Sequence, residues 1–410
     1  MTDKAETAQE QIRGEITAAR RELGIPEMRG VEEYVRDECA VLRREADAHG
    51  SAVPEIAYED VARGTVSAAS VARIRRRGCV VVRGVYERAL AEEWNSEIAR
   101  YIEDNDYQGK SLSRRGMDKY FSDLAADAPQ IYALYWSRPQ VMARQGGRMA
   151  VLKRFLNGLW DAAGEFDGAE DYTYADRLRR RRAGDDTLGL SPHIDGGSYE
   201  RWTDAAFREI YAPVFEGRWA DYDPWCARRR TAVENFPSPA VCSMFRSFQG
   251  WVALSGQGVG DGTLQMVPVA NGIVYLLLRA LQGDVGEGEL CGAEPGRALG
   301  VLPEWHGDLL EGLVTVPWMD PGDGVWWHPD LVHGVESRHG GSESSNVIYV
   351  GVSPRCEKNR LYGERQARAF LEGRSPPDFA SEDYEVDFAG RALESDLSDL
   401  GRAQMTLDNN

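Results

Sequence analysis

The sequence LGLSPHIDGG, residues 188–197, runs from a strand-like segment into a His-x-Asp pair and then into two glycines. Side chains two residues apart on a strand point to the same face, so His193 and Asp195 can present an imidazole and a carboxylate to one metal ion. Gly196 and Gly197 allow the backbone to turn directly after the pair. This stretch therefore predicts part of a metal site at the end of a strand.

The third ligand is expected in a second stretch, GDGVWWHPDLVHG, residues 322–334. Two histidines and one carboxylate form a facial triad, which holds Fe(II) and leaves three coordination positions open. An apolar strand, a turn and the start of another strand bring His333 toward the first pair. His328 begins another His-x-Asp pair, but Pro329 interrupts the strand there and leaves His328 a hydrogen-bonding role. A third such pair, beginning at His306, falls at the start of a predicted helix.

The composition limits the classes of partner. The chain has 410 residues and a net charge of −18, so its surface repels phosphate, which argues against nucleic acid and anionic membranes. The N-terminus lacks the apolar core of a signal peptide, and the most apolar run, residues 273–278, is too short to span a bilayer. We expect a cytoplasmic protein that acts on a small-molecule substrate, and the sequence leaves its oligomeric state open.

The order of predicted elements indicates an α+β fold. Helices predominate early, including residues 87–105 and 140–163, around one strand at residues 79–84. Short strand-like runs follow, at residues 175–181, 188–194, 241–254, 263–268, 313–316, 324–328 and 346–353. This pattern predicts a barrel or sandwich that carries a helical layer.

The chain divides into three predicted parts. Residues 1–50 form a helical arm, residues 51–375 form a single domain, and residues 376–410 form an acidic C-terminal tail that we expect to be solvated. Within the domain, an aromatic-rich insertion near residues 200–240 is compatible with a small second core, a dimer contact or a substrate lid.

Several motifs together resemble the non-haem Fe(II)/2-oxoglutarate-dependent dioxygenase superfamily of the phytanoyl-CoA hydroxylase type. Gly322-Asp323 followed by His333-Gly334 is similar to the distal-histidine motif of these enzymes, and His193-x-Asp195 to the proximal one. GTLQMVP (residues 262–268) and RRGCVVVRG (residues 76–84) resemble two of their strands. More narrowly, the motifs PHIDGG, ERW, FQGW and NVIY, beginning at residues 192, 200, 248 and 346, resemble the YbiU-like branch.

The resemblance extends over about residues 50–360 and implies a fold, a metal site and an activity. The implied fold is a double-stranded β-helix (cupin or jelly-roll) core with a helical N-terminal layer. The implied metal ligands are His193, Asp195 and His333, which would bind Fe(II). The implied reaction uses 2-oxoglutarate as cosubstrate together with O2, and it hydroxylates, desaturates or cyclises a substrate while releasing succinate and CO2.

One position departs from the resemblance. Relatives of the phytanoyl type place an arginine about eleven residues after the distal histidine to bind the distal carboxylate of 2-oxoglutarate, and Ser344 stands there in this chain. Another arginine must serve if 2-oxoglutarate binds, because a shielded anion needs a cationic partner. Arg246, in a predicted strand, is the first choice, and Arg355, after the last predicted strand, is the second.

A further group of arginines precedes the His-x-Asp pair. Arg177, Arg179 and Arg181 alternate along a predicted strand, so they share one face and are candidates for binding an anionic substrate or cosubstrate. They are equally compatible with pairing to the many acids of this chain. Trp202 follows the metal pair closely and is expected to form a wall of the substrate pocket.

The function indicated first is an Fe(II)- and 2-oxoglutarate-dependent oxygenase that oxidises a small carboxylate-bearing metabolite such as an amino acid. The absence of arginine at position 344 leaves a second hypothesis open. In it, the protein is a metal-binding cupin without redox chemistry that acts as a small-molecule binder, hydrolase or isomerase. A third hypothesis is a scaffold whose aromatic insertion contacts a partner.

Overall fold

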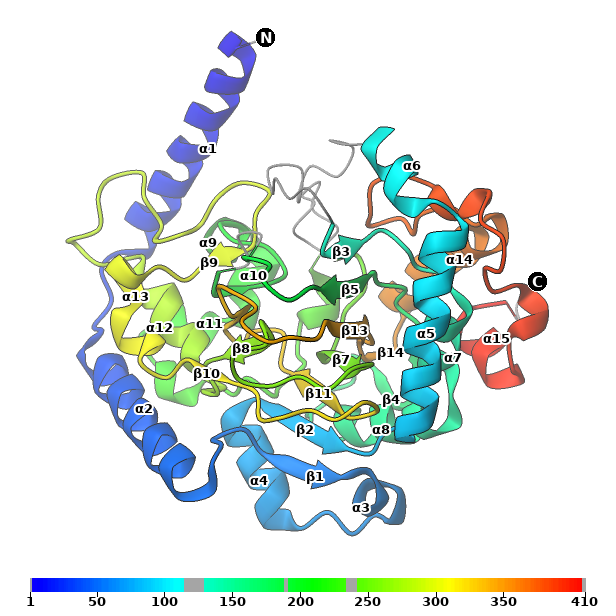
Figure 1. The fold of residues 1–410 in the computed structure, drawn as a ribbon. Coiled ribbons are helices and arrows are strands. Elements are labelled where there is room, and N and C mark those ends of the chain that lie inside the picture. Colours follow the sequence, from blue (N-terminus) through cyan, green and yellow to red (C-terminus); the bar gives the residue numbers. More distant parts are fainter. Residues whose placement is uncertain (1, 114–128, 188–190, 234–241, 408–410) are drawn as a thin grey trace.

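The computed structural model describes residues 2–113, 129–187, 191–233 and 242–407. The two larger sheets lie at the centre of the molecule (Figure 1). The first has seven strands in the order β1 (Glu55–Ala57), β2 (Cys79–Arg83), β11 (Gly324–Trp327), β7 (Gln249–Ala253), β13 (Ser345–Tyr349), β5 (Leu178–Arg181) and β3 (Ile131–Tyr132). The second has five strands in the order β10 (Val314–Thr315), β8 (Leu264–Met266), β12 (His333–Val335), β6 (His193–Ile194) and β9 (Leu299–Gly300). A small third sheet pairs β14 (Ser353–Arg355) with β4 (Asp167–Tyr172).

Helices cover both central sheets. Their bounds are α1 (Thr2–Leu23), α2 (Arg29–His49), α3 (Tyr58–Arg63), α4 (Ala68–Arg77), α5 (Arg88–Asp104), α6 (Tyr107–Ser113), α7 (Arg138–Gln145), α8 (Gly147–Asn157), α9 (Glu200–Thr203), α10 (Ala205–Ile210), α11 (Ala212–Phe215), α12 (Gly272–Arg279), α13 (Pro303–Leu310), α14 (Glu357–Glu372) and α15 (Asp399–Gln404). The helix α1 projects from the body, whereas α5, α7, α14 and α15 lie together at the side opposite α12 and α13 (Figure 1).

Because side chains alternate between the two faces of each strand, the sheets contribute to three separate hydrophobic cores. Val81, Trp251 and Val325 of the seven-stranded sheet share one buried core with Leu264 and Met266 of the five-stranded sheet. This inter-sheet core lies between the two sheets, because it draws side chains from both. The alternate residues of β2, β7 and β11 belong to a second core that includes residues of α4, α5, α7, α8 and α14. A third core packs the outer face of the five-stranded sheet against α1, α2 and α9 to α13.

Most of the predicted elements are confirmed. The strand at residues 79–84 and the helix at residues 87–105 correspond to β2 and α5. The helix predicted at residues 140–163 is wrong in part, because the chain is extended at Gly146 and divides it into α7 and α8. Residues 188–190 of one predicted strand, residue 241 of another and residues 234–240 of the aromatic insertion lie outside the described residues.

The acidic C-terminal segment is packed on the body, which corrects the expectation of a solvated tail. Tyr384, Phe388 and Leu407 are buried in the helix-lined core. The buried carboxylate of Glu385 accepts hydrogen bonds from the backbone N–H groups of Tyr135 and Trp136. The acids that suggested solvation lie between these buried anchors.

A close approach of two strands requires glycine at position 250. A Cβ atom at Gly250 of β7 would lie 2.3 Å from Cδ1 of Trp326, a fully buried side chain of β11. Gly250→Ala is therefore expected to lower the free energy of unfolding by about 2 kcal/mol through overpacking, as measured by urea denaturation. Gly14→Ala on α1 is the control, since its Cβ would meet no atom within 4 Å, and it should cause no loss of stability.

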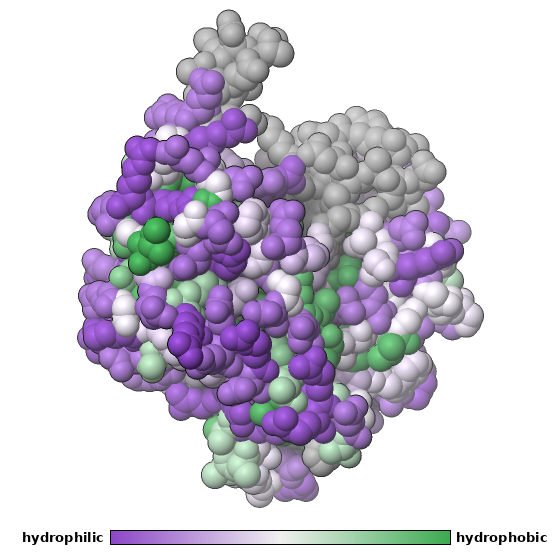
Figure 2. Space-filling model, turned by 90° about the vertical axis from the view of Figure 1, so that its left-hand side faces the viewer, coloured by the Kyte–Doolittle hydropathy of each residue, from purple (hydrophilic) through white to green (hydrophobic). Residues whose placement is uncertain are grey.

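The surface drawn in Figure 2 is mostly hydrophilic, and hydrophobic residues form small separate spots on it. None of the helices in the described ranges combines the length and the apolar character needed to cross a membrane.

Candidate metal centre

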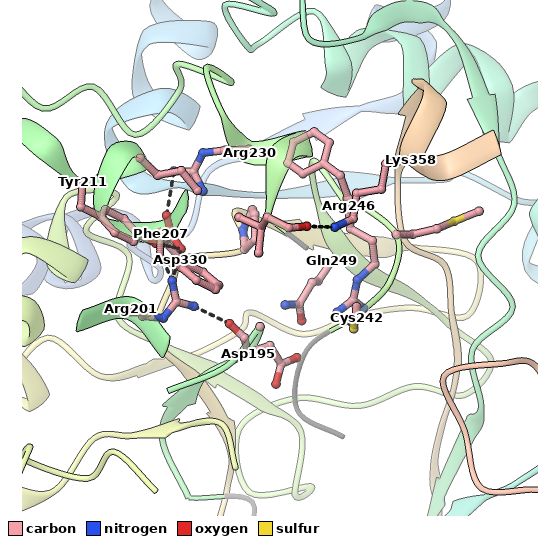
Figure 3. A pocket seen from close by; sticks show the side chains of 16 residues that line it. Asp195, Arg201, Phe207, Tyr211, Arg230, Cys242, Arg246, Gln249, Asp330 and Lys358 are labelled. Carbon is pink, nitrogen blue, oxygen red and sulfur yellow. Dashed lines mark hydrogen bonds and ion pairs between the residues drawn. The ribbon is translucent and has the colours of Figure 1, made fainter. Parts of the chain in front are cut away.

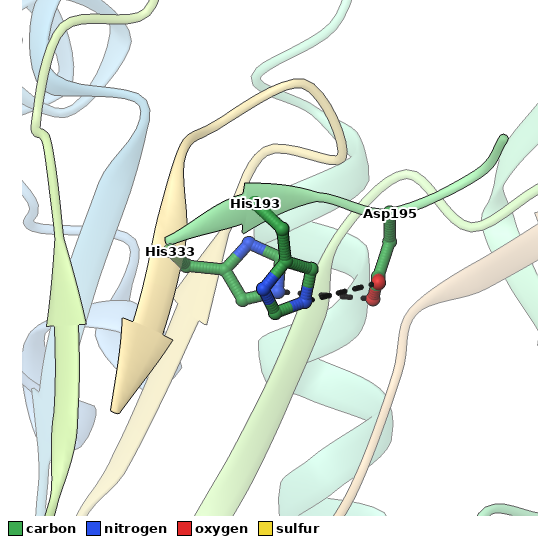
Figure 4. Close-up of side chains that lie close together, drawn as sticks. All are labelled: His193, Asp195 and His333. Atoms are coloured by element: carbon green, nitrogen blue, oxygen red, sulfur yellow. Dashed lines mark ion pairs between the residues drawn. The ribbon is translucent and has the colours of Figure 1, made fainter. Parts of the chain in front are cut away.

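His193 and His333 face each other across two antiparallel strands. The register of β6 and β12 makes them direct partners, and their ring centroids are 4.5 Å apart. His333 is also paired with Met266 of the inter-sheet core, so both imidazoles point into the space between the sheets. Asp195 follows two residues after His193 and turns its carboxylate toward both rings (Figure 4). The structure thus brings together the three residues that the sequence indicated as metal ligands.

The distances among these three side chains suit one small cation. Nε2 of His193 is 3.3 Å from Oδ1 of Asp195, and Nε2 of His333 is 3.7 Å from Oδ2. Metal–ligand bonds of about 2.1 Å place adjacent ligands roughly 3 Å apart, so small side-chain rotations would complete the coordination. Gly196 and Gly197, both with positive φ, make the predicted turn directly after Asp195.

Backbone carbonyl groups orient both imidazoles. Nδ1 of His193 lies 2.8 Å from the carbonyl oxygen of Ser191, and Nδ1 of His333 lies 2.9 Å from that of Leu331. A carbonyl oxygen only accepts hydrogen bonds, so each Nδ1 carries the proton and each Nε2 keeps its lone pair. Outer hydrogen bonds of this kind fix the tautomer that a metal requires.

The electrostatics favour an ionised carboxylate between the two rings. Burial raises the pKa of Asp195, but hydrogen bonds and charge interactions with His193 and His333 outweigh it and hold that pKa well below its usual value. Burial lowers the pKa of His193, and the neighbouring Asp195 more than offsets this, so the net shift is upward. Burial dominates at His333 and lowers its pKa.

The other histidines that the sequence singled out lie elsewhere. His328 is stacked on Trp160, with ring centroids 4.7 Å apart, and its Nε2 is 2.9 Å from the carbonyl oxygen of Pro224. Burial lowers the pKa of His328 to about 3, so it is a neutral core residue. Nδ1 of His306 accepts a hydrogen bond from the N–H of Leu302 at the start of α13, where the sequence predicted a helix.

A pocket adjoins the metal centre through Asp195 (Figure 3). Its apolar lining includes Phe207, Met244 and Phe245, and Gln249 of β7 also reaches it. Its cationic lining consists of Arg201, Arg230, Arg246 and Lys358. The pocket thus combines an apolar wall with several positive groups beside the candidate metal site.

Asp330 organises part of this lining. Its carboxylate lies 3.2 Å from Nη1 of Arg201 and 2.8 Å from Nη2 of Arg230, and it accepts a 2.8 Å hydrogen bond from the hydroxyl of Tyr211. The two arginines hold the pKa of Asp330 below its usual value, even though burial raises it. Nη2 of Arg201 also donates to the carbonyl oxygen of Asp195, so the network supports the metal-site turn.

This network could not be predicted from the sequence. Asp330 was visible as the second residue of a His-x-Asp pair, and Arg201 in the ERW motif. Nothing in their spacing indicated that they meet.

Of the arginines proposed for 2-oxoglutarate, only one reaches the pocket. Arg246 is largely buried in its lining, where Nη2 lies 3.0 Å from Sγ of Cys242 and Nη1 lies 3.8 Å from Oδ2 of Asp176. Arg355 is on the surface and paired with the exposed Glu170, so the structure does not support the second choice.

The side chains of Arg177, Arg179 and Arg181 do not all lie in the same surroundings. Arg179 and Arg181 of β5 both donate to the carbonyl oxygen of Gly262, whereas Arg177 precedes the strand and lies over the ring of Phe379. Trp202 is fully buried in the core outside the five-stranded sheet and is absent from the pocket lining, so the expectation that it forms a wall is wrong. The turn at Gly196 and Gly197 directs α9, and Trp202 with it, toward that core.

Comparison with known sequences places the chain in a family. The sequence model of the Gig2-like family matches residues 6–407. The chain belongs to the Gig2-like family. The uncharacterized protein YbiU of Escherichia coli (strain K12) is 40% identical over 368 residues, which cover 88% of this chain and 87% of YbiU. The YbiU-like relationship that the motifs indicated is thereby confirmed.

Solved structures of similar proteins share the fold of this Gig2-like chain. A Salmonella typhimurium LT2 protein described as a candidate oxidoreductase has 36% identity and a TM-score of 0.88, covering 97% of each chain. The GlcNAc Inducible Gene 2 protein, GIG2 (DUF1479), of Candida albicans has 25% identity and a TM-score of 0.79, covering 96% of this chain and 89% of its own.

Proposed function

We propose that this Gig2-like protein is an Fe(II)- and 2-oxoglutarate-dependent oxygenase of the phytanoyl-CoA hydroxylase type. The observation that carries the proposal is the cluster of two imidazoles and one carboxylate between the sheets, with both Nε2 atoms facing the carboxylate. The core shared by the two sheets supports a double-stranded β-helix. The description of the Salmonella relative as a candidate oxidoreductase agrees with this activity.

The proposal assigns a role to each side chain of the site. Bound Fe(II) and 2-oxoglutarate supply the oxidising chemistry, in which O2 is consumed, 2-oxoglutarate becomes succinate and CO2, and a substrate C–H bond is oxidised. His193, Asp195 and His333 would hold the metal, and the carbonyl groups behind the histidines fix the orientation of the imidazoles so that each Nε2 would be free to bind it. Arg201 anchors the backbone of Asp195.

The lining of the pocket is suited to a small, anionic substrate. Arg230 and Arg246 with Lys358 supply positive charge to the lining, which a negatively charged protein needs in order to attract an anion. Phe207 and Phe245 offer an apolar surface for the hydrocarbon part of such a molecule. A carboxylate-bearing metabolite, such as an amino acid, fits this combination.

Arg246 is proposed to bind the substrate carboxylate in this pocket. Arg246→Met is expected to raise the KM for the substrate about a hundredfold, because a shielded charge-assisted pair contributes about 3 kcal/mol. The KM for 2-oxoglutarate should change little. Steady-state succinate formation with each reactant varied in turn measures both constants, and an unchanged substrate KM would remove Arg246 from the substrate site.

The proposal is tested by screening amino acids, other organic acids and neutral metabolites for substrate-stimulated succinate formation under air. We expect stimulation by a small carboxylate. Stimulation only by large neutral compounds would contradict the substrate class. Metal binding without 2-oxoglutarate turnover would favour a cupin without redox chemistry.

A further inference from the structure

Arg179 points into the space between the two sheets. It lies within β5 and is only 6% exposed. In the register of β5 and β13 it is paired with Val347, a member of the inter-sheet core, so both side chains lie on the inner face. His193 and His333 point into the same space from the five-stranded sheet. Arg179 therefore shares the interior with the candidate metal centre.

The guanidinium of Arg179 is poorly satisfied by protein groups. Among the described residues it makes a single hydrogen bond, of 3.0 Å, from Nη2 to the carbonyl oxygen of Gly262, and its buried Nε has no partner there. No carboxylate in the described ranges forms an ion pair with it, and burial lowers its pKa. A buried cation without a counter-ion is unfavourable, so this position is suited to receive an anion.

Arg181, on the same face of the same strand, provides the contrast. It is fully buried, and its Nε, like that of Arg179, has no partner in the described ranges, yet it donates to three carbonyl oxygens, those of Gly262, Glu336 and Asp185. These three bonds explain Arg181 as a structural residue that joins β5 to neighbouring turns. The single hydrogen bond of Arg179 does not explain its burial in the same way.

Tyr349 adds a hydroxyl group to the same region. It follows Val347 by two residues on β13, so it lies on the inner face, and it is the one partly exposed residue of that strand. Burial raises the pKa of Tyr349, and among the nearby charges Arg179 lowers it while Asp195 raises it. The hydroxyl of Tyr349 is thus within range of the charges of both Arg179 and Asp195.

We propose that Arg179, assisted by the hydroxyl of Tyr349, binds the distal carboxylate of 2-oxoglutarate. This inference rests on the proposed function and names the residue that replaces the arginine missing at position 344. It also reverses the preference for Arg246 that the sequence suggested. Arg246 lines the adjoining pocket, where it is available to the substrate.

The test measures 2-oxoglutarate binding without turnover. Mn(II) replaces iron, O2 is excluded, and titration calorimetry gives the dissociation constant of 2-oxoglutarate. Arg179→Met should weaken binding about a hundredfold, and Arg179→Lys about tenfold, because lysine keeps the charge but loses the forked geometry. Arg181→Met and Arg246→Met are the matched controls, and both should stay within about threefold of the wild-type protein.

Thermal unfolding of the metal-free proteins separates a binding role from a structural one. Arg179→Met should unfold at or above the wild-type temperature, since it removes a buried charge that makes one hydrogen bond, whereas Arg181→Met loses three hydrogen bonds and should unfold at a lower temperature. Retained 2-oxoglutarate affinity in Arg179→Met, or a hundredfold loss in Arg246→Met instead, would overturn the assignment while leaving the oxygenase proposal intact. Absence of 2-oxoglutarate binding to the Mn(II)-loaded wild-type protein would overturn both.

Discussion

Asp195→Ala is expected to abolish stoichiometric Fe(II) binding and to lower turnover by more than about a hundredfold. The carboxylate would supply the charged ligand of the proposed triad, and it lies 3.3 Å and 3.7 Å from the two imidazole Nε2 atoms. Loss of an outer hydrogen-bond partner already weakens metal sites by about 10- to 100-fold, so loss of a ligand should exceed that. His333→Ala should behave in the same way. Iron content per chain after anaerobic loading and desalting measures the effect directly.

His328→Gln is the matched control for the histidine variants. His328 belongs to a neighbouring His-x-Asp pair, but it is held between Trp160 and Trp225, away from the triad. The variant should retain one iron per chain, although packing losses will lower its stability. If His333→Ala kept its iron and activity while His328→Gln lost both, the distal ligand would have been wrongly assigned.

Asp330→Ala is expected to lower the free energy of unfolding by about 3–5 kcal/mol, because it leaves Arg201 and Arg230 as buried cations without their counter-ion. Urea denaturation of the metal-free protein measures this loss. Asp330→Asn, which keeps the size of the side chain but removes its charge, should also be destabilised.

The surface pair of Glu170 and Arg355 supplies the control for this prediction. Both side chains are exposed, so Glu170→Ala should leave the unfolding midpoint unchanged. Wild-type stability in Asp330→Ala would show that the two arginines are stabilised without this carboxylate.

The meeting of the three side chains of the candidate metal centre could be predicted from sequence because their geometry is local. On a strand, spacing alone places His193 and Asp195 on one face, and the two glycines mark the turn that follows. His333 required only the expectation that a second strand starts beside the first, which the register of β6 and β12 bears out.

The partners of the long side chains could not be predicted in this way. Arginine has several rotatable bonds, and its partners come from distant parts of the chain, as when Arg179 and Arg181 reach Gly262. The same strand therefore carries one arginine that donates to three carbonyl oxygens and another that donates to one. Asp330, Arg201 and Arg230 likewise meet only through the tertiary fold.

Two further differences between the sequence predictions and the structure have identifiable causes. Trp202 is close to Asp195 in sequence but lies on the far side of the five-stranded sheet, since the intervening glycines reverse the direction of the chain. The acids of the C-terminal segment predict a solvated tail, whereas its position depends on a few buried groups such as Tyr384 and Glu385. The overall composition of the segment does not reveal these few buried groups.

The measurement that tests the oxygenase proposal most directly is the conversion of 2-oxoglutarate to succinate, followed together with O2 consumption. The wild-type protein loaded with Fe(II) should form succinate and consume O2 in equal amounts when a substrate is present. The Zn(II)-loaded protein and Asp195→Ala should form none. An iron-loaded wild-type protein that consumes O2 without forming succinate, or succinate formation that persists with Zn(II), would contradict the proposal.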